Sequence, residues 1–196
     1  MDGVVSICNQ ALDLVGASPI NDLADSGSSA QFCQRNWPAV RDDVLAEHPW
    51  NCALRRDQLA ATDPAPAFKW AYAFNLPSDC LRIVGCDDLR QVDDWEQIAD
   101  RKIGANTAGP LNLVYVASIE DVNLIDRPIL KVMVYELAVR LAPKIIGSTR
   151  AMERLETSRG YWAAQARRID SQLAAPKTWH HGDWLEARIG PPEVYL

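Results

Sequence analysis

Three histidines, His48, His180 and His181, are the side chains best suited to acid–base or metal chemistry near neutral pH. The run His180-His181-Gly182-Asp183 could bring two imidazoles and a carboxylate near one another. Adjacent residues point in different directions, however, and no His-x-x-x-His pair or cysteine partner accompanies them. His48 precedes Pro49-Trp50, where a helix is expected to end, so we predict a capping or stacking role for it. The histidines therefore predict no metal site and no catalytic base.

A group of carboxylates is the next candidate, because clustered carboxylates can hold magnesium for phosphoryl chemistry. Its members are Asp87, Asp88, Asp93, Asp94 and Glu96. A nuclease would also need a basic clamp, and only Arg90, Arg101 and Lys102 lie close in sequence. The spacing matches no known cation loop such as the EF-hand. A solvated loop is the favoured interpretation, and a metal-dependent nuclease or hydrolase using residues 87–96 is the alternative.

The familiar catalytic motifs are missing from the sequence. It contains no Gly-x-Ser-x-Gly elbow, no glycine-rich phosphate loop with its Lys-Ser/Thr, and no dinucleotide fingerprint. We therefore expect no enzyme, no cofactor, no metal and no catalytic residue.

The composition limits the other function classes. The 196 residues are 48% hydrophobic and 23% charged, which suits one globular domain or a domain with an inserted subdomain. The net charge of -6 argues against a protein that grips nucleic acid by neutralising phosphates. The N-terminus has no charged leader, and four charges interrupt the longest apolar stretch, residues 129–146, so we expect no signal peptide and no membrane span. Five scattered cysteines without a Cys-x-x-Cys pair predict reduced thiols in a protein made in the cytoplasm.

Four helices are predicted from apolar residues at helical spacing. The first covers about residues 4–15 and stops at Gly16; the second follows the serines before Ala30, which we expect to cap it, and Pro38 should kink it or delay its start. The third begins after Asp126 and is apolar on nearly every side, so it should be central and buried. The fourth is expected to be capped by Ser148 or Thr149. Its seam, in steps of three and four residues, consists of Met152, Leu155, Trp162, Ala166, Ile169 and Leu173.

Between these helices the period changes to that of short strands. Residues 72–76, 81–84 and 111–116 are β-prone and are separated by turn residues, as a small antiparallel sheet requires. We therefore predict an α+β fold: a four-helix bundle with an inserted small antiparallel β subdomain and an extended C-terminal tail. The helical bundle would comprise residues 1–50 and 125–175, the β-rich insertion residues 51–124, and the tail residues 176–196.

Two sets of residues are candidates for protein contacts. The one polar line on the third helix consists of Glu136, Arg140 and Lys144, and Arg159 interrupts the apolar seam of the fourth helix. We predict a subunit interface at Arg140, Lys144 and Arg159. For Arg159 the alternative is a surface arginine whose stem snorkels. Trp179, Trp184 and Tyr195 lie on an irregular tail, where large apolar groups need a surface to bury them. That surface is either the body of the chain or a partner. Trp37, Trp50 and Trp70, in contrast, are expected in the core.

Four stretches in this order resemble the tail tubular protein A family of tailed bacteriophages. They are ALDLVGASPINDL, VRDDVLAEHPWNCALRRDQLA, YAFNLPSDCLRIV and GPLNLVYVASIED, and the resemblance covers about residues 4–169. The Glu-His-Pro-Trp-Asn run at residues 47–51 is among its most specific pieces. The sequence departs from the family at Cys52, where an aromatic residue is expected, and the resemblance does not extend beyond Ala175.

The resemblance implies a structural protein of the virion. It implies a head-to-tail adaptor in the neck of the particle, made in the bacterial cytoplasm and assembled as a ring of twelve subunits that joins the portal protein to the next tail or nozzle component. DNA would pass through the ring without specific binding, and an acidic channel would repel its phosphates. We expect portal docking through Trp179, Trp184 and Tyr195. A small soluble binding or scaffold protein is a further alternative.

Overall fold

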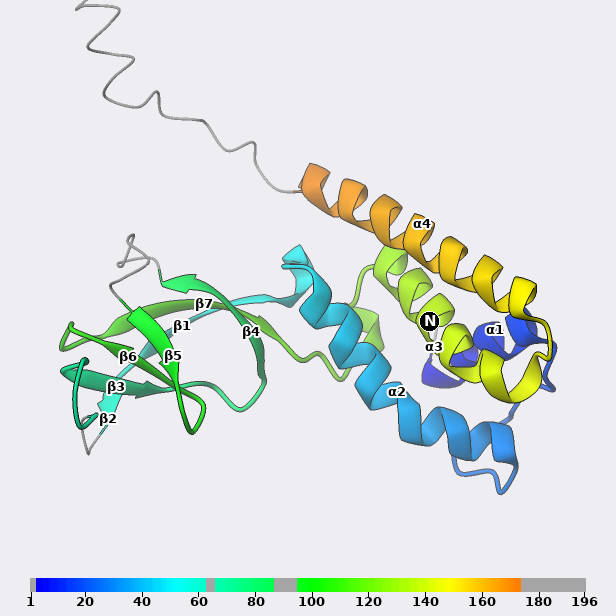
Figure 1. The fold of residues 1–196 in the computed structure, drawn as a ribbon, viewed down its shortest axis with the longest axis horizontal. Helices are drawn as coiled ribbons and strands as arrows, with labels where there is room; N and C mark the ends of the chain where they lie inside the picture. Colours follow the sequence, from blue (N-terminus) through cyan, green and yellow to red (C-terminus); the bar gives the residue numbers. More distant parts are fainter. Residues whose placement is uncertain (1–2, 63–65, 87–94, 174–196) are drawn as a thin grey trace, which may run out of the picture.

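The computed structural model describes residues 3–62, 66–86 and 95–173, and these form four α-helices and seven β-strands. The helices gather on one side of the molecule and the strands on the other (Figure 1). We refer to α1–α4 as the helical part and to β1–β7 as the β part. The fold is thus mixed α+β, as predicted, and every described strand lies between the second and third helices in the sequence. No helix of the described residues is long and apolar enough to cross a bilayer.

The first two helices form where apolar residues recur at helical spacing. Helix α1 (Val4–Val15) buries Ile7, Cys8, Ala11, Leu12 and Val15, and ends at Gly16, whose φ of 74° is the left-handed conformation that glycine adopts readily. Helix α2 (Ser28–Glu47) starts directly after Gly27, so the prediction of a serine cap is wrong. Pro38 lies inside α2 and does not delay its start, because the turns before it already bury an apolar face through Ala30, Cys33 and Trp37.

Helix α3 (Arg127–Ile145) is the central element of the helical part, as predicted. It buries nine residues and packs against α1, α2 and α4. The prediction of a four-helix bundle is not supported by this arrangement. In a bundle each helix packs against two neighbours around a shared axis, whereas here the three other helices pack mainly on α3.

The β part contains two antiparallel sheets. One has the order β1-β7-β4 and is formed by β1 (Leu54–Leu59), β7 (Leu111–Ala117) and β4 (Cys80–Cys86). The other has the order β2-β3-β6-β5 and is formed by β2 (Ala61–Thr62), β3 (Tyr72–Asn75), β6 (Lys102–Ala105) and β5 (Trp95–Ile98). The predicted strands correspond to β3, β4 and β7, whereas β1, β2, β5 and β6 were not predicted.

Strand β7 connects two hydrophobic cores. Tyr115 and Ala117 belong to the core of the β part, together with Phe74 and Ile103 of the other sheet. Val116, whose side chain points to the opposite face, belongs to the core of the helical part and is fully buried. The alternation of side chains along one strand therefore joins the β part to the helices.

Helix α4 (Thr149–Leu173) packs on α3 with only part of its predicted seam. Leu155 and Ala166 are buried and Trp162 is half-buried, but Ile169 and Leu173 are 43% and 64% exposed. In the last two turns of α4, Asp170 is buried instead of these two apolar residues. Successive helical residues differ by about 100° around the axis, so burying Asp170 turns Ile169 outward.

Candidate functional site at residues 47–51

The chain passes from the helical part to the β part through residues 47–51, which we call the junction. Trp50 is completely buried, and its indole nitrogen donates a hydrogen bond to the Val44 carbonyl at 2.8 Å. This bond satisfies one of the carbonyls that a helix leaves unpaired at its C-terminus. His48 is the C-cap of α2, and its ring contacts the Trp50 ring edge to face at 4.7 Å between centroids. Of the predicted capping or stacking role, the structure shows His48 at the C-cap position, and its ring contact with Trp50 is edge to face rather than stacked.

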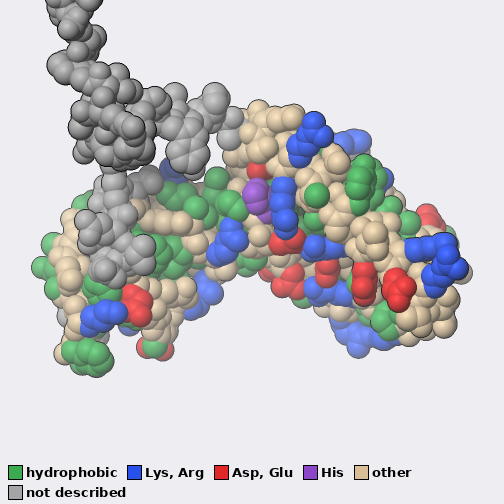
Figure 2. All heavy atoms as spheres, turned by 45° about the horizontal axis from the view of Figure 1, so that its top comes forward, with side chains coloured by type: hydrophobic (Ala, Val, Ile, Leu, Met, Phe, Trp, Pro, Cys, Tyr) green, Lys and Arg blue, Asp and Glu red, His purple; other side chains and the backbone are tan. Residues whose placement is uncertain are grey.

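Glu47, the last residue of α2, binds two arginines of α4. Arg159 and Arg167 each donate to its carboxylate, and Arg159 also donates to Glu136 of α3 at 3.0 Å. Burial alone would lower the pKa of Arg159, but the carboxylates of Glu47 and Glu136 outweigh burial and hold that pKa above its ordinary value. One arginine therefore connects three helices. Figure 2 shows acidic and basic side chains lying beside one another on this face of the helical part.

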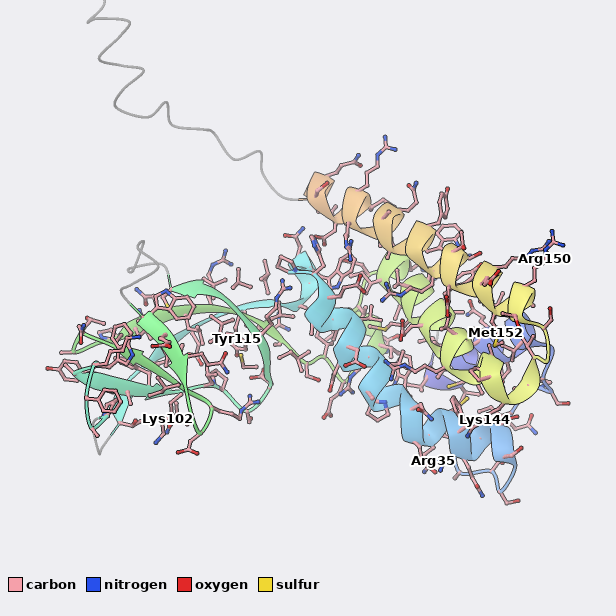
Figure 3. The ribbon with its side chains drawn as sticks, in the orientation of Figure 1. Arg35, Lys102, Tyr115, Lys144, Arg150 and Met152 are labelled. Atoms are coloured by element: carbon pink, nitrogen blue, oxygen red, sulfur yellow. The ribbon has the colours of Figure 1, made fainter. Side chains whose placement is uncertain are left out.

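The network continues along the polar line of α3. Arg140 donates to Glu136 at 3.0 Å and to Asp43 of α2 at 2.6 Å. Lys144 is exposed near the far end of the helical part (Figure 3), and its ammonium group lies 4.7 Å from the centre of the Phe32 ring. Arg140 and Arg159 thus have partners within the chain, and neither is an isolated surface arginine. The subunit interface predicted at Arg140, Lys144 and Arg159 stays a prediction.

Asp170 joins the last turn of α4 to the junction. Its carboxylate accepts the backbone N–H of Asn51 at 2.9 Å, and its carbonyl accepts the Asn51 side-chain amide at 2.7 Å. His48 Nε2 lies 3.7 Å from the other carboxylate oxygen. Asp170 is 6% exposed and is the one buried charged residue among those described. Burial lowers the pKa of His48, while the negative charge of Asp170 partly opposes that effect.

Three further contacts connect the β part to α2. Arg82 of β4 donates to the Glu47 carbonyl at 3.3 Å. Arg41 donates to the Ser118 hydroxyl at 3.1 Å, and that hydroxyl donates to Asp42 at 2.7 Å. The junction is therefore the place where α2, α3, α4 and the β part meet. Its buried indole, its ion pairs and its paired amide hold elements in fixed positions, which is a mechanical role.

A hollow of about 600 Å³ lies elsewhere, on the outer face of the β2-β3-β6-β5 sheet. Trp70 packs there against Gly104, where a Cβ atom would come within 2.6 Å of Trp70 Cγ. Glu96, the one described member of the acidic group, binds Lys69 and accepts the Trp70 indole N–H at 3.3 Å. Residues 87–94 lie outside the described residues. Glu96, Lys69 and Trp70 therefore contact one another at the border of this hollow.

The tail residues predicted to dock on a portal, Trp179, Trp184 and Tyr195, also lie outside the described residues, as do His180 and His181. Within the described ranges, no three His, Cys, Asp or Glu side chains are grouped closely enough to hold a metal ion. None of the five cysteines forms a disulfide. Trp37, Trp50 and Trp70 are buried, as predicted.

No protein-family model matches the chain, and no curated protein matches it.

Sequence reasoning identified the run at residues 47–51 but not its partners. Glu47 and Arg159 are 112 residues apart in the chain, and Asn51 and Asp170 are 119 apart. The available signal was the polar residue Arg159 inside an otherwise apolar seam, because a buried charge needs a partner. The sequence offers several carboxylates, and only the fold selects Glu47 and Glu136.

Proposed function

We propose that this chain is a structural protein of a tailed bacteriophage, a head-to-tail adaptor in the neck of the virion. Twelve copies would form a ring between the portal protein and the next tail or nozzle component. DNA would pass through the ring without being bound, since a chain of net charge -6 does not supply the basic footprint that phosphate binding requires. The resemblance of four ordered stretches to the tail tubular protein A family motivates this function.

The hydrogen bonds and ion pairs of residues 47–51 are the observation that supports this function best. This run is among the most specific pieces of the resemblance, and its side chains and backbone bind α4 and the β part to the end of α2. An adaptor must hold two partners at a set distance and orientation. A junction built from a buried indole, shared carboxylates and a paired amide meets that mechanical requirement.

We propose that the two ends of the chain have different partners. Residues 174–196 follow directly after α4, and docking of Trp179, Trp184 and Tyr195 on the portal would bury their large apolar side chains. The β part would face the next tail component. Neighbouring subunits would contact one another through helix faces, a heterologous contact that closes into a ring; Lys144 is the exposed member of the predicted interface set.

Assembly in infected cells tests the tail docking. A chain that ends at Pro176, and a full-length chain with Trp179→Ala and Trp184→Ala, should each fail to join portal-bearing heads. Trp95→Ala, which removes an indole from the β part instead, is the control and should still join them. Normal attachment of the shortened chain to heads would show that the tail does not dock on the portal.

A further inference from the structure

Two cations on α3 face solvent without an acidic partner. Arg127 and Lys131 lie one helical turn apart and are both exposed. Neither forms an ion pair with any residue in the described ranges. Lys131 instead lies 4.5 Å from the centre of the Trp162 ring on α4. These cations contrast with Arg140 of α3 and with Arg159 and Arg167 of α4, which are all paired with carboxylates.

An apolar row on α4 borders the same region. Ile169 and Leu173 are 43% and 64% exposed, and their spacing of four residues places them one above the other on α4; Tyr161, two turns before Ile169, is 57% exposed. Twelve residues of helix extend about 18 Å. Exposed apolar side chains arranged in a row of this length are typical of a protein-binding surface.

Two hollows border the cations, and one of them reaches the exposed apolar residues of α4. One, of about 130 Å³, lies between α3 and α4 and is lined by Arg127, Pro128, Ile169 and Leu173 among others. The other, of about 170 Å³, lies between α1 and α3 and is lined by Arg127, Lys131 and Leu130 among others. Arg127 lines both hollows. We call the surface bordered by Arg127, Lys131, Ile169 and Leu173 the α3–α4 groove; Tyr161, which contacts the Trp162 ring beside Lys131, extends it along α4.

The charges at the groove favour an acidic partner. Two carboxylates border the α3–α4 hollow, Asp126 and Asp170. Asp170 is buried and accepts the Asn51 N–H, so its charge is directed toward the junction. Asp126 lies beside Arg127, which leaves the surface around Lys131 as the part that attracts a carboxylate most strongly.

We propose that the α3–α4 groove is the docking surface for an amphipathic helix of a partner protein, about three turns long, with carboxylates along one edge of its apolar face. Apolar side chains of the helix would lie on Ile169, Leu173 and Tyr161, and its carboxylates beside Lys131 and Arg127, which is the helix-in-groove mode of recognition. This surface is separate from the tail docking proposed above, and the inference does not depend on an adaptor function.

A designed peptide probes the groove directly. The probe is a three-turn amphipathic helical peptide with leucines on one face and glutamates along its edge; a second peptide has lysines in place of the glutamates. Binding to the full-length chain is followed by fluorescence anisotropy of the labelled peptide and by amide chemical shifts. The acidic peptide should bind more tightly than the basic one and should shift amides in the first turns of α3 and the last turns of α4.

Charge reversal then tests the cations. The variant R127E/K131E should lose about tenfold or more in affinity for the acidic peptide, because like charges across an interface are strongly unfavourable. It should also gain affinity for the basic peptide. The matched control is R150E/R154E, which reverses two other exposed cations four residues apart; Arg150 lies at the start of α4, at the opposite end from Leu173 (Figure 3). That control should leave both affinities unchanged.

Three results would overturn the proposal. The first is equal binding of the acidic and basic peptides, or of the parent and R127E/K131E. The second is a set of shifts centred on the hollow of the β part. The third is binding that appears only in the full-length W179A/W184A variant, which would show that the groove belongs to the chain's own C-terminal segment.

Discussion

Glu47 holds two arginines of α4 at once, and this residue anchors the helix to α2. The substitution Glu47→Gln keeps the shape of the side chain but removes the charge from both ion pairs. We expect the free energy of unfolding to fall by about 1–2 kcal/mol, since hydrogen bonds to charged groups are worth more than neutral ones but these are partly exposed. The midpoint of urea unfolding should fall without a change in its slope. The control is Glu153→Gln on the exposed side of α4; an equal loss in both variants would contradict the anchoring role of Glu47.

Asp170 accepts the Asn51 backbone N–H, and we expect this contact to need the acceptor oxygen rather than the negative charge. Asp170→Asn retains an oxygen for the Asn51 N–H, whereas Asp170→Ala leaves that donor buried and unpaired. We expect Asp170→Ala to cost about 1–3 kcal/mol and Asp170→Asn to cost clearly less. Hydrogen exchange should show faster opening of the last two turns of α4 in the alanine variant. Equal exchange rates in the two variants would show that the hydrogen bond does not hold α4.

His48 should make stability depend on pH. Burial lowers its pKa in the folded chain below the ordinary 6.5, so the unfolded chain takes up a proton more readily. The stabilisation that depends on neutral His48 is therefore complete above pH 6.5 and is lost as the pH falls through the lower pKa of the folded state. Urea unfolding between about pH 5 and about pH 7 should show a steeper rise in the parent than in His48→Gln. Parallel pH profiles would mean that His48 titrates alike in both states.

At the scale of the elements, the packing of Trp70 on Gly104 stabilises the outer face of the β2-β3-β6-β5 sheet. Gly104→Ala forces the indole to move, and we expect a loss of about 1–3 kcal/mol in the free energy of unfolding. Gly85→Ala in β4 is the matched control, because a Cβ there meets nothing within 4 Å. Unfolding followed by tryptophan fluorescence distinguishes the two. A loss at Gly85 as large as that at Gly104 would show that backbone effects, and not the Trp70 contact, decide the result.

The helices could be predicted from the sequence because their signal is local. The buried faces of α1, α2 and α3 repeat at helical spacing, and Gly16 marks an end. Strand β1 could not be predicted in this way, since four of the six residues in LRRDQL are exposed and no apolar alternation appears. It is an edge strand held by its pairing with β7, and that pairing is a long-range contact.

The candidate site was predictable only in part, for the same reason. Residues 47–51 stand out in the sequence, and the role of His48 follows from the residues beside it. The partners of Glu47 and Asn51 come from α4, more than 100 residues later. The seam predicted for α4 included Ile169, but the bonds between Asn51 and Asp170 favour burial of the carboxylate and leave Ile169 exposed. Local periodicity contains no information about such a contact.

At the scale of the whole molecule, the described residues behave as two connected cores. Val116 and Tyr115, neighbours on one strand, each belong to a different core, and Arg82 and Arg41 add polar contacts between the β part and α2. With the adaptor function proposed above, a chain built in this way would hold one partner at a set position relative to the other. That property is what an adaptor ring requires of each subunit.

Electron microscopy of the purified chain mixed with the portal oligomer of the same phage tests the adaptor function most directly. We expect an added ring of twelve copies on one end of the portal, with an open central channel and one copy of the chain for each portal subunit. Portal particles that stay bare at saturating concentrations of the folded chain would contradict that function.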